Sequence, residues 1–170
     1  MGNSVIVVEH DEQMMREADW IVDIGPKAGR LGGKVLFSGK PDELLKTDTL
    51  TAQFLNGEKK VNDGNDGNDV NGANDGNEAQ FLTLKGCTGN NLKNVTVKIP
   101  VGKMICVTGV SGSGKSSLIN QTLYPILSQH FYRSKRQPLP YKQITGLKLI
   151  DKVINVDQSP IGRLPRSNPA

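Results

Sequence analysis

The sequence is poor in cysteine and aromatic residues, and it contains no long apolar run. Cys87 and Cys106 are the two cysteines among 170 residues, and no CxxC spacing occurs, so neither a disulfide framework nor a zinc site is indicated. No apolar run approaches the ~20 residues that span a bilayer, and no secretion signal opens the chain. We therefore expect a cytoplasmic protein without a membrane segment.

Charge is distributed unevenly along the chain, and the formal net charge of +4 conceals this. Residues 1–60 carry −2, residues 61–79 carry −5 and residues 80–170 carry +11. The basic C-terminal part favours polyanions such as nucleotides or nucleic acid. A truncated domain that lacks its balancing acidic residues would show the same excess, so both interpretations stay open.

An acidic, polar stretch separates two structured parts. Residues 61–79 repeat Asp-Gly-Asn at Asp63, Asp66 and Asp75 and contain almost nothing apolar. Such a stretch cannot offset the entropy of ordering, which predicts a flexible linker between a unit at 1–60 and a unit at 80–170. No window fits the calcium-loop pattern, which argues against a calcium site.

Apolar runs and turn residues predict an α/β protein with a mixed sheet and flanking helices. The runs are short and lie between Gly, Pro and Asp residues, and Asp11 is suited to cap a helix. In residues 1–60 the pattern predicts strands at 4–8, 20–24 and 34–37 and helices at 12–18 and 41–45. In residues 80–170 it predicts antiparallel strands at 81–84 and 92–99, strands at 104–108 and 152–156, and a helix at 115–127 whose end Pro125 kinks.

A complete phosphate-binding motif, G-x-x-x-x-G-K-[ST], lies between the strand at 104–108 and the helix at 115–127. Glycines let a backbone wrap an anion closely, and a helix N-terminus adds partial positive charge. Lys115 is suited to reach the β- and γ-phosphates, and Ser116 to offer its hydroxyl to Mg²⁺. The alternative is a glycine-rich turn without a ligand. The predicted nucleotide-binding residues are Gly109, Val110, Ser111, Gly112, Ser113, Gly114, Lys115, Ser116 and Ser117.

Two segments of the basic part resemble the ATP-binding cassette (ABC) family of P-loop ATPases and, within it, the UvrA family. The first is NNLKNVTVKIPVGKMICVTGVSGSGKSSLIN, and the second is DKVINVDQSPIGRLPRSNPA. The resemblance implies that Gln158 is the Q-loop glutamine, which senses Mg²⁺ and the γ-phosphate. Taken alone, Gln158 would be an ordinary polar residue after a strand. Arg163 and Arg166 are attractive for phosphate, but we place them outside the core site.

Residues 5–11, VIVVEHD, resemble the switch segment that ends the catalytic part of an ABC ATPase. The resemblance implies that His10 contacts the γ-phosphate and positions the hydrolytic water, although a histidine after a strand is more often an ordinary polar residue. It also implies that 1–60 ends a first ATPase module and 80–170 begins a second. His10 and Lys115 would then serve different catalytic sites.

For the parent protein, the resemblance implies a homodimeric ATPase of nucleotide excision repair and the SOS response. It would use ATP and Mg²⁺ to recognise damaged double-stranded DNA and to load UvrB. Zinc is expected in that parent, but its cysteine ligands are absent here. The chain alone is expected to lack catalytic competence. Two alternatives stay open, a basic nucleic-acid-binding module that does not use nucleotide and an inert truncation.

Overall fold

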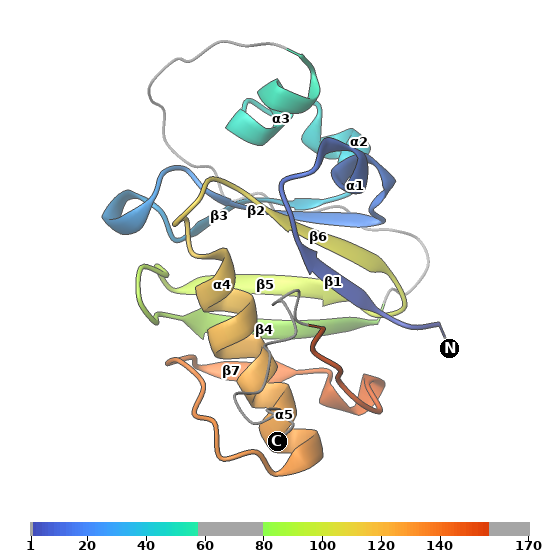
Figure 1. Ribbon diagram of the computed structural model, residues 1–170, viewed down its shortest axis with the longest axis vertical. Helices are drawn as coiled ribbons and strands as arrows, with labels where there is room; N and C mark the ends of the chain where they lie inside the picture. Colours follow the sequence, from blue (N-terminus) through green and yellow to red (C-terminus); the bar gives the residue numbers. More distant parts are fainter. Residues whose placement is uncertain (1, 58–79, 157–170) are drawn as a thin grey trace, which may run out of the picture.

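The computed structural model describes residues 2–57 and 80–156, which form two sheets with helices packed against them (Figure 1). The larger sheet has four strands in the order β1-β6-β2-β3, and the smaller has three in the order β5-β4-β7. A mixed sheet with flanking helices was predicted, and the structure confirms this coarse α/β architecture.

Strand β6 (Met104–Thr108) lies inside the larger sheet and leads into the phosphate-binding loop. It pairs in parallel with β1 (Val5–Val8) on one side and with β2 (Trp20–Gly25) on the other. Strand β3 (Lys34–Gly39) closes the sheet antiparallel to β2. All of β6 beyond Met104 is buried, and a buried strand needs hydrogen-bonding partners on both edges.

Strands from 1–60 and 80–170 therefore share one sheet, a pairing across the predicted linker that the sequence did not predict. The edges of β6 account for this, because β1 and β2 satisfy backbone groups that a separate second unit would leave open. Assignment of the two stretches to different ATPase modules stays a prediction. The predicted linker at 61–79 lies outside the described residues.

The smaller sheet confirms the predicted antiparallel pair, formed by β4 (Phe81–Cys87) and β5 (Val95–Pro100). A third strand, β7 (Gln143–Thr145), pairs antiparallel with the other edge of β4 and was not predicted. It is only three residues long, and two of them are exposed and polar. Such a strand carries no apolar alternation that sequence reasoning could detect.

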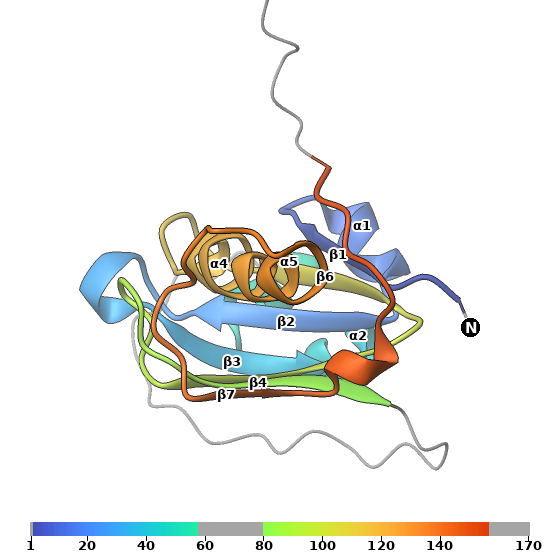
Figure 2. The ribbon, with the colours of Figure 1, turned by 90° about the horizontal axis from the view of Figure 1, so that it is seen from below.

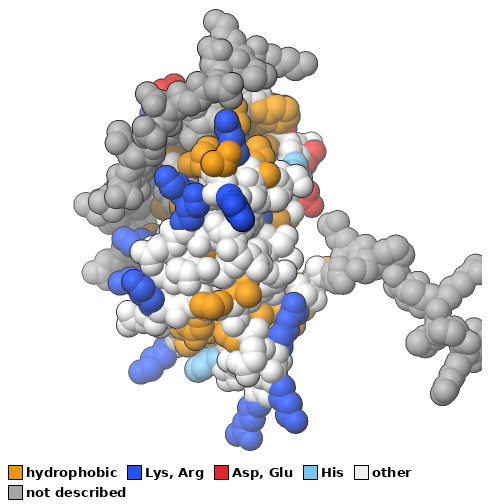
Figure 3. Space-filling model, turned by 90° about the vertical axis from the view of Figure 1, so that its left-hand side faces the viewer, with side chains coloured by type: hydrophobic (Ala, Val, Ile, Leu, Met, Phe, Trp, Pro, Cys, Tyr) orange, Lys and Arg blue, Asp and Glu red, His pale blue; other side chains and the backbone are white. Residues whose placement is uncertain are grey.

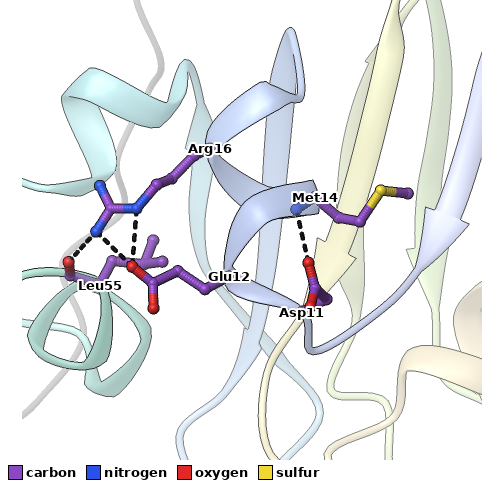
Figure 4. Close-up of polar contacts among 5 residues, drawn as sticks. All are labelled: Asp11, Glu12, Met14, Arg16 and Leu55. Carbon is purple, nitrogen blue, oxygen red and sulfur yellow. Dashed lines mark hydrogen bonds and ion pairs between the residues drawn. The ribbon is translucent and has the colours of Figure 1, made fainter.

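Three short helices cover one face of the larger sheet: α1 (Glu12–Glu17), α2 (Pro41–Leu44) and α3 (Leu50–Leu55). Asp11 caps α1 as predicted, because its carboxylate accepts a 3.0 Å hydrogen bond from the Met14 amide (Figure 4). In the same view Arg16 pairs with Glu12 at 2.8 Å and donates to the Leu55 carbonyl, which ties α1 to α3. Helix α3 was not predicted.

On the other face, one continuous helical stretch follows the phosphate-binding loop and lies over β2 (Figure 2). It comprises α4 (Lys115–Leu118), a π-helical turn (Ile119–Leu123) and α5 (Tyr124–Tyr132). The helix was predicted to end near residue 127 and instead continues to Tyr132, with Pro125 in the first turn of α5 directly after the π-helical turn. Pro125 has no N–H for the Gln121 carbonyl, and the Leu139 amide binds that carbonyl at 2.9 Å instead.

The predicted strand at 152–156 is also wrong. Two 3₁₀ turns, Gly29–Leu31 and Leu147–Leu149, complete the elements of the described ranges, and residues 152–156 follow without regular structure. Contacts with Tyr132 account for the position of residues 152–156, since the Tyr132 Oη donates to the Val153 carbonyl at 2.7 Å and accepts from the Val153 amide at 3.1 Å. The backbone groups of Val153 thus bind the end of α5 rather than a sheet.

Strand β1 is a half-buried edge strand, with Val5 49% exposed. Within residues 2–57 and 80–156, no helix combines the length and apolar character needed to cross a membrane. The same residues contain no cluster of His, Cys, Asp or Glu able to hold a metal ion.

Candidate nucleotide-binding site

The phosphate-binding loop turns sharply at the carboxyl end of β6. Three of its glycines adopt positive φ angles, +125° at Gly109, +75° at Gly112 and +119° at Gly114. At Gly109 a Cβ atom would lie 2.0 Å from the carbonyl oxygen of Ile24 on neighbouring β2. Glycine is therefore required there both for the backbone angle and for the close approach of the two strands.

Lys115 folds back across the loop. Its ammonium Nζ donates to the carbonyl oxygens of Gly109 at 2.8 Å and Val110 at 3.0 Å, and the residue is only 6% exposed. Burial lowers the pKa of Lys115, and the carboxylate of Asp23 partly opposes this effect. The lysine is thus held over the loop by neutral carbonyls, which are weaker partners for a cation than phosphate oxygens.

The four serines among the predicted nucleotide-binding residues lie in different surroundings. Ser111 and Ser116 are exposed, and Ser117 Oγ accepts a 3.0 Å hydrogen bond from Asn90. Ser113 Oγ is buried and has no hydrogen-bond partner within the described part of the chain. Ser116 is the second residue of α4, after Lys115, and is exposed, which fits the hydroxyl ligand expected for Mg²⁺.

Asp23 is a charged residue that sequence reasoning missed. It lies on β2 opposite Thr108, the last residue of β6 before the loop, and is 1% exposed. Burial raises the pKa of Asp23 to about 6, while hydrogen bonds from Thr51 and Thr49 and the charge of Lys115 lower it. The signal was present, because Asp23 is the only charged residue within the apolar run 20–24.

His10 follows β1 at the same end of the sheet at which the phosphate-binding loop follows β6. Strands β1 and β6 are parallel, with Val8 opposite Val107, and the Glu9 amide donates to the Val107 carbonyl at 3.3 Å. His10 follows directly and is exposed. Sequence reasoning placed His10 and Lys115 in different catalytic sites, yet in this chain the structure brings their segments to one edge. The catalytic role of His10 stays a prediction.

The remaining predicted site residue, Gln158, lies outside the described residues, as do Arg163 and Arg166. Its assignment as a glutamine that senses Mg²⁺ and γ-phosphate therefore stays a prediction. The structure describes all nine predicted residues of the phosphate-binding loop and its helix start, together with His10.

Comparison with known proteins covers the whole chain. It is 53% identical to the UvrABC system protein A of Neisseria meningitidis serogroup A, 53% identical to that of Clostridium perfringens and 49% identical to that of Thermus thermophilus, each over 171 residues. These alignments include 100% of this chain. The chain belongs to the UvrA family. It spans 17% to 18% of the length of these UvrA proteins.

A crystal structure of UvrA2 from Deinococcus radiodurans is 41% identical and aligns with 95% of this chain and 18% of its own, with a TM-score of 0.44. No protein-family model matches the sequence. The UvrA assignment therefore rests on sequence identity along the full chain, and it confirms the family resemblance carried by residues 90–120 and 151–170.

Proposed function

We propose that this chain supplies a nucleotide-binding loop of a UvrA protein, in which ATP binding and hydrolysis drive the search for DNA damage and the loading of UvrB. The observation that carries the proposal is the loop itself, with three positive-φ glycines and a buried lysine at its centre. The identity of about 50% to UvrA proteins along the chain supports the repair context.

Nucleotide binding would exchange the partners of Lys115. Its ammonium now bonds to the carbonyls of Gly109 and Val110, and a β- or γ-phosphate oxygen would replace them. A charge-assisted hydrogen bond is about twice as strong as a neutral one, so the exchange favours the bound state. The backbone N–H groups of the loop and the start of α4 would add favourable partial charges at the phosphates.

Magnesium would be held through the hydroxyl of Ser116, an exposed residue in the first turn of α4, and the ion would neutralise charge on the phosphates. The proposed role of Gln158 is to sense the ion and the γ-phosphate, and that of His10 is to contact the γ-phosphate. Within the proposal, 1–60 and 80–170 belong to successive ABC-type modules of a homodimeric, cytoplasmic parent that acts on damaged double-stranded DNA. The zinc of that parent has no ligands in this chain, which alone would not hydrolyse ATP.

The test is a chimera in which this chain replaces the matching segment of Thermus thermophilus UvrA, to which it is 49% identical. We expect the chimera to hydrolyse ATP and to load UvrB onto damaged DNA, and we expect Lys115→Ala to remove both activities. Lys103→Ala is the matched control, because Lys103 is an exposed lysine on the turn before β6. A folded chimera whose Lys115→Ala variant keeps full ATPase activity would contradict the proposal.

A second candidate function is nucleic-acid binding by the basic part, independent of nucleotide. Residues 80–156 contain eleven Lys and Arg residues but one acidic residue, Asp151. Figure 3 shows Lys and Arg side chains spread over one face of the molecule with few acidic side chains among them. A steep salt dependence of DNA affinity that survives Lys115→Ala would favour this function.

A further inference from the structure

Two adjacent asparagines lie beside the phosphate-binding loop without belonging to its motif. Asn90 and Asn91 occupy the connection between β4 and β5, and Asn90 has a positive φ of +54°. Asparagine tolerates this left-handed conformation better than most residues. The turn directs both side-chain amides to hydrogen-bond acceptors in and after the loop.

Asn91 connects the loop to a segment from the N-terminal part of the chain. Its Nδ2 donates to the carbonyl oxygens of Gly112 at 3.1 Å and Gly29 at 3.3 Å. The Gly29 amide in turn donates to the Gly112 carbonyl at 3.1 Å. Asn91, Gly29 and Gly112 therefore form a closed set of three hydrogen bonds that joins three separate segments.

Backbone contacts extend this connection along residues 29–33. The Gly33 amide donates to the Ser113 carbonyl at 2.8 Å, and the Gly33 carbonyl accepts from the Lys93 amide at 2.8 Å. The β4–β5 connection lies so close to Gly33 that there is no room for a side chain there, because a Cβ at Gly33 would lie 1.8 Å from the Asn91 carbonyl oxygen. At Gly32 a Cβ would lie 3.1 Å from the Ser113 carbonyl oxygen.

Asn90 fixes the stretch just after the loop. Its Nδ2 donates to Ser117 Oγ at 3.0 Å and to Gln121 Oε1 at 2.7 Å. The two asparagines therefore hold the loop at Gly112 and the helix at Ser117, on either side of Lys115. Neither of them makes a hydrogen bond to Lys115 within the described part of the chain.

Within the loop, the groups that accept from Asn91 and from residues 29–33 are the carbonyls of Gly112 and Ser113, whereas a phosphate-binding loop contacts its anion through N–H groups. These contacts therefore hold the loop in shape without competing with the phosphates. They also bring the N-terminal part of the chain, through Gly29 and Gly33, into direct contact with Gly112 and Ser113.

We propose that Asn91, together with residues 29–33, is a positioning clamp that holds the phosphate-binding loop ready for nucleotide. This inference rests on the proposed function, since it concerns the affinity of the same loop. Without the clamp, Gly112 and Ser113 sample other conformations, and part of the binding free energy goes into ordering them. Nucleotide binding, conversely, slows the opening of residues 29–33.

Asn91→Ala in the 170-residue chain is the test, with Asn56→Ala as the matched control. Asn56 also donates a side-chain amide to a backbone carbonyl, that of Leu45 at 3.0 Å, in the α2–α3 region. Asn91 lines an open hollow of about 410 Å³, so truncation leaves no enclosed cavity. Asn91→Asp serves as a second variant of equal size that removes the donor.

Two measurements on each variant separate the clamp from a merely structural role. The first is hydrogen exchange of the Gly29 and Gly33 amides, and the second is affinity for MgATP by fluorescence competition. For Asn91→Ala we expect exchange at both amides to become about tenfold faster and the Kd to rise about three- to tenfold, as loss of one or two hydrogen bonds implies. Asn56→Ala should change neither.

Unchanged exchange at Gly29 and Gly33 in both Asn91 variants would overturn the clamp. Faster exchange with an unchanged Kd would overturn its positioning role and leave only a structural contact. If the unaltered chain fails to bind MgATP, the proposed function fails, and the role in affinity fails with it. The exchange measurement then still decides whether Asn91 holds residues 29–33 on the loop.

Discussion

The carboxylate of Asp23 and the ammonium of Lys115 act on each other at the carboxyl end of the sheet. The charge of Lys115 lowers the pKa of Asp23, and the charge of Asp23 raises the pKa of Lys115. In both cases burial has the larger and opposite effect, so the pKa of Asp23 is raised to about 6 and that of Lys115 is lowered. Burial of these two charged groups beside the loop therefore lowers the free energy of unfolding.

The first prediction concerns this buried carboxylate. Because the pKa of Asp23 is about 6 in the folded chain against 3.8 for the free side chain, the folded state binds the proton more tightly. Stability of the unaltered chain should therefore fall as the pH rises from about 4 to about 6, relative to Asp23→Asn. At pH 7.5 the variant should be more stable by about 2 to 3 kcal/mol, an upper figure for two pKa units.

Urea unfolding of both proteins at pH 4, 5, 6 and 7.5 checks this prediction. The difference in unfolding free energy should be small at pH 4 and grow toward pH 7.5. A difference that stays constant over the whole range would show that the carboxylate of Asp23 does not titrate as the buried environment requires.

A second prediction concerns the close approach of the loop to β2. Gly109→Ala would place a Cβ 2.0 Å from the Ile24 carbonyl oxygen at a φ of +125°, so backbone must move. We expect a loss of about 3 kcal/mol or more in unfolding free energy. Gly57→Ala is the control, since Gly57 has a φ of +71° and open space around it, and should cost about 1 kcal/mol. Equal losses in thermal or urea unfolding would contradict the packing at Gly109.

The third prediction concerns the two cysteines. Cys87 and Cys106 are 0% exposed, and burial raises the pKa of each thiol from 9.0 to about 11. Since the thiolate is the reactive form, both should react with a thiol reagent at pH 8 at least about a hundredfold more slowly in the folded chain than in urea. Labelling of the folded chain followed by mass spectrometry checks this. Rapid labelling at either cysteine would mean that its strand opens readily.

Sequence reasoning located most elements because their signals are local. The apolar run ending at Val8, the Asp11 cap and the loop glycines each act within a few residues, and the structure confirms those elements. The surroundings of Pro125 depend on a distant residue, because the Leu139 amide binds the Gln121 carbonyl that the missing N–H of Pro125 leaves free. Residues 152–156 were misjudged because an apolar alternation does not reveal the contact with Tyr132.

In the candidate site, too, the residues with local sequence signals were predicted and those that depend on distant contacts were not. The motif identified Lys115 and its loop directly, since the spacing of glycines and lysine encodes the chemistry. Neither Asp23 nor Asn91 was predicted, because each lies next to residues that are far away in the sequence. Asp23 is opposite Thr108 on the neighbouring strand, and Asn91 donates a hydrogen bond to the Gly112 carbonyl. The pairing of β1 with β6 could not be predicted either, because it depends on which strand edges are free in the folded sheet.

Nucleotide binding by this loop is tested most directly by a calorimetric titration of the chain with MgATP, run beside Lys115→Ala and the Lys103→Ala control. We expect saturable binding to the unaltered chain and to Lys103→Ala, and affinity at least about tenfold weaker for Lys115→Ala, because one charge-assisted contact to phosphate contributes about 1.5 to 3 kcal/mol. Binding of equal strength in all three proteins, or none in the unaltered chain, would contradict the claim that this loop is a nucleotide site.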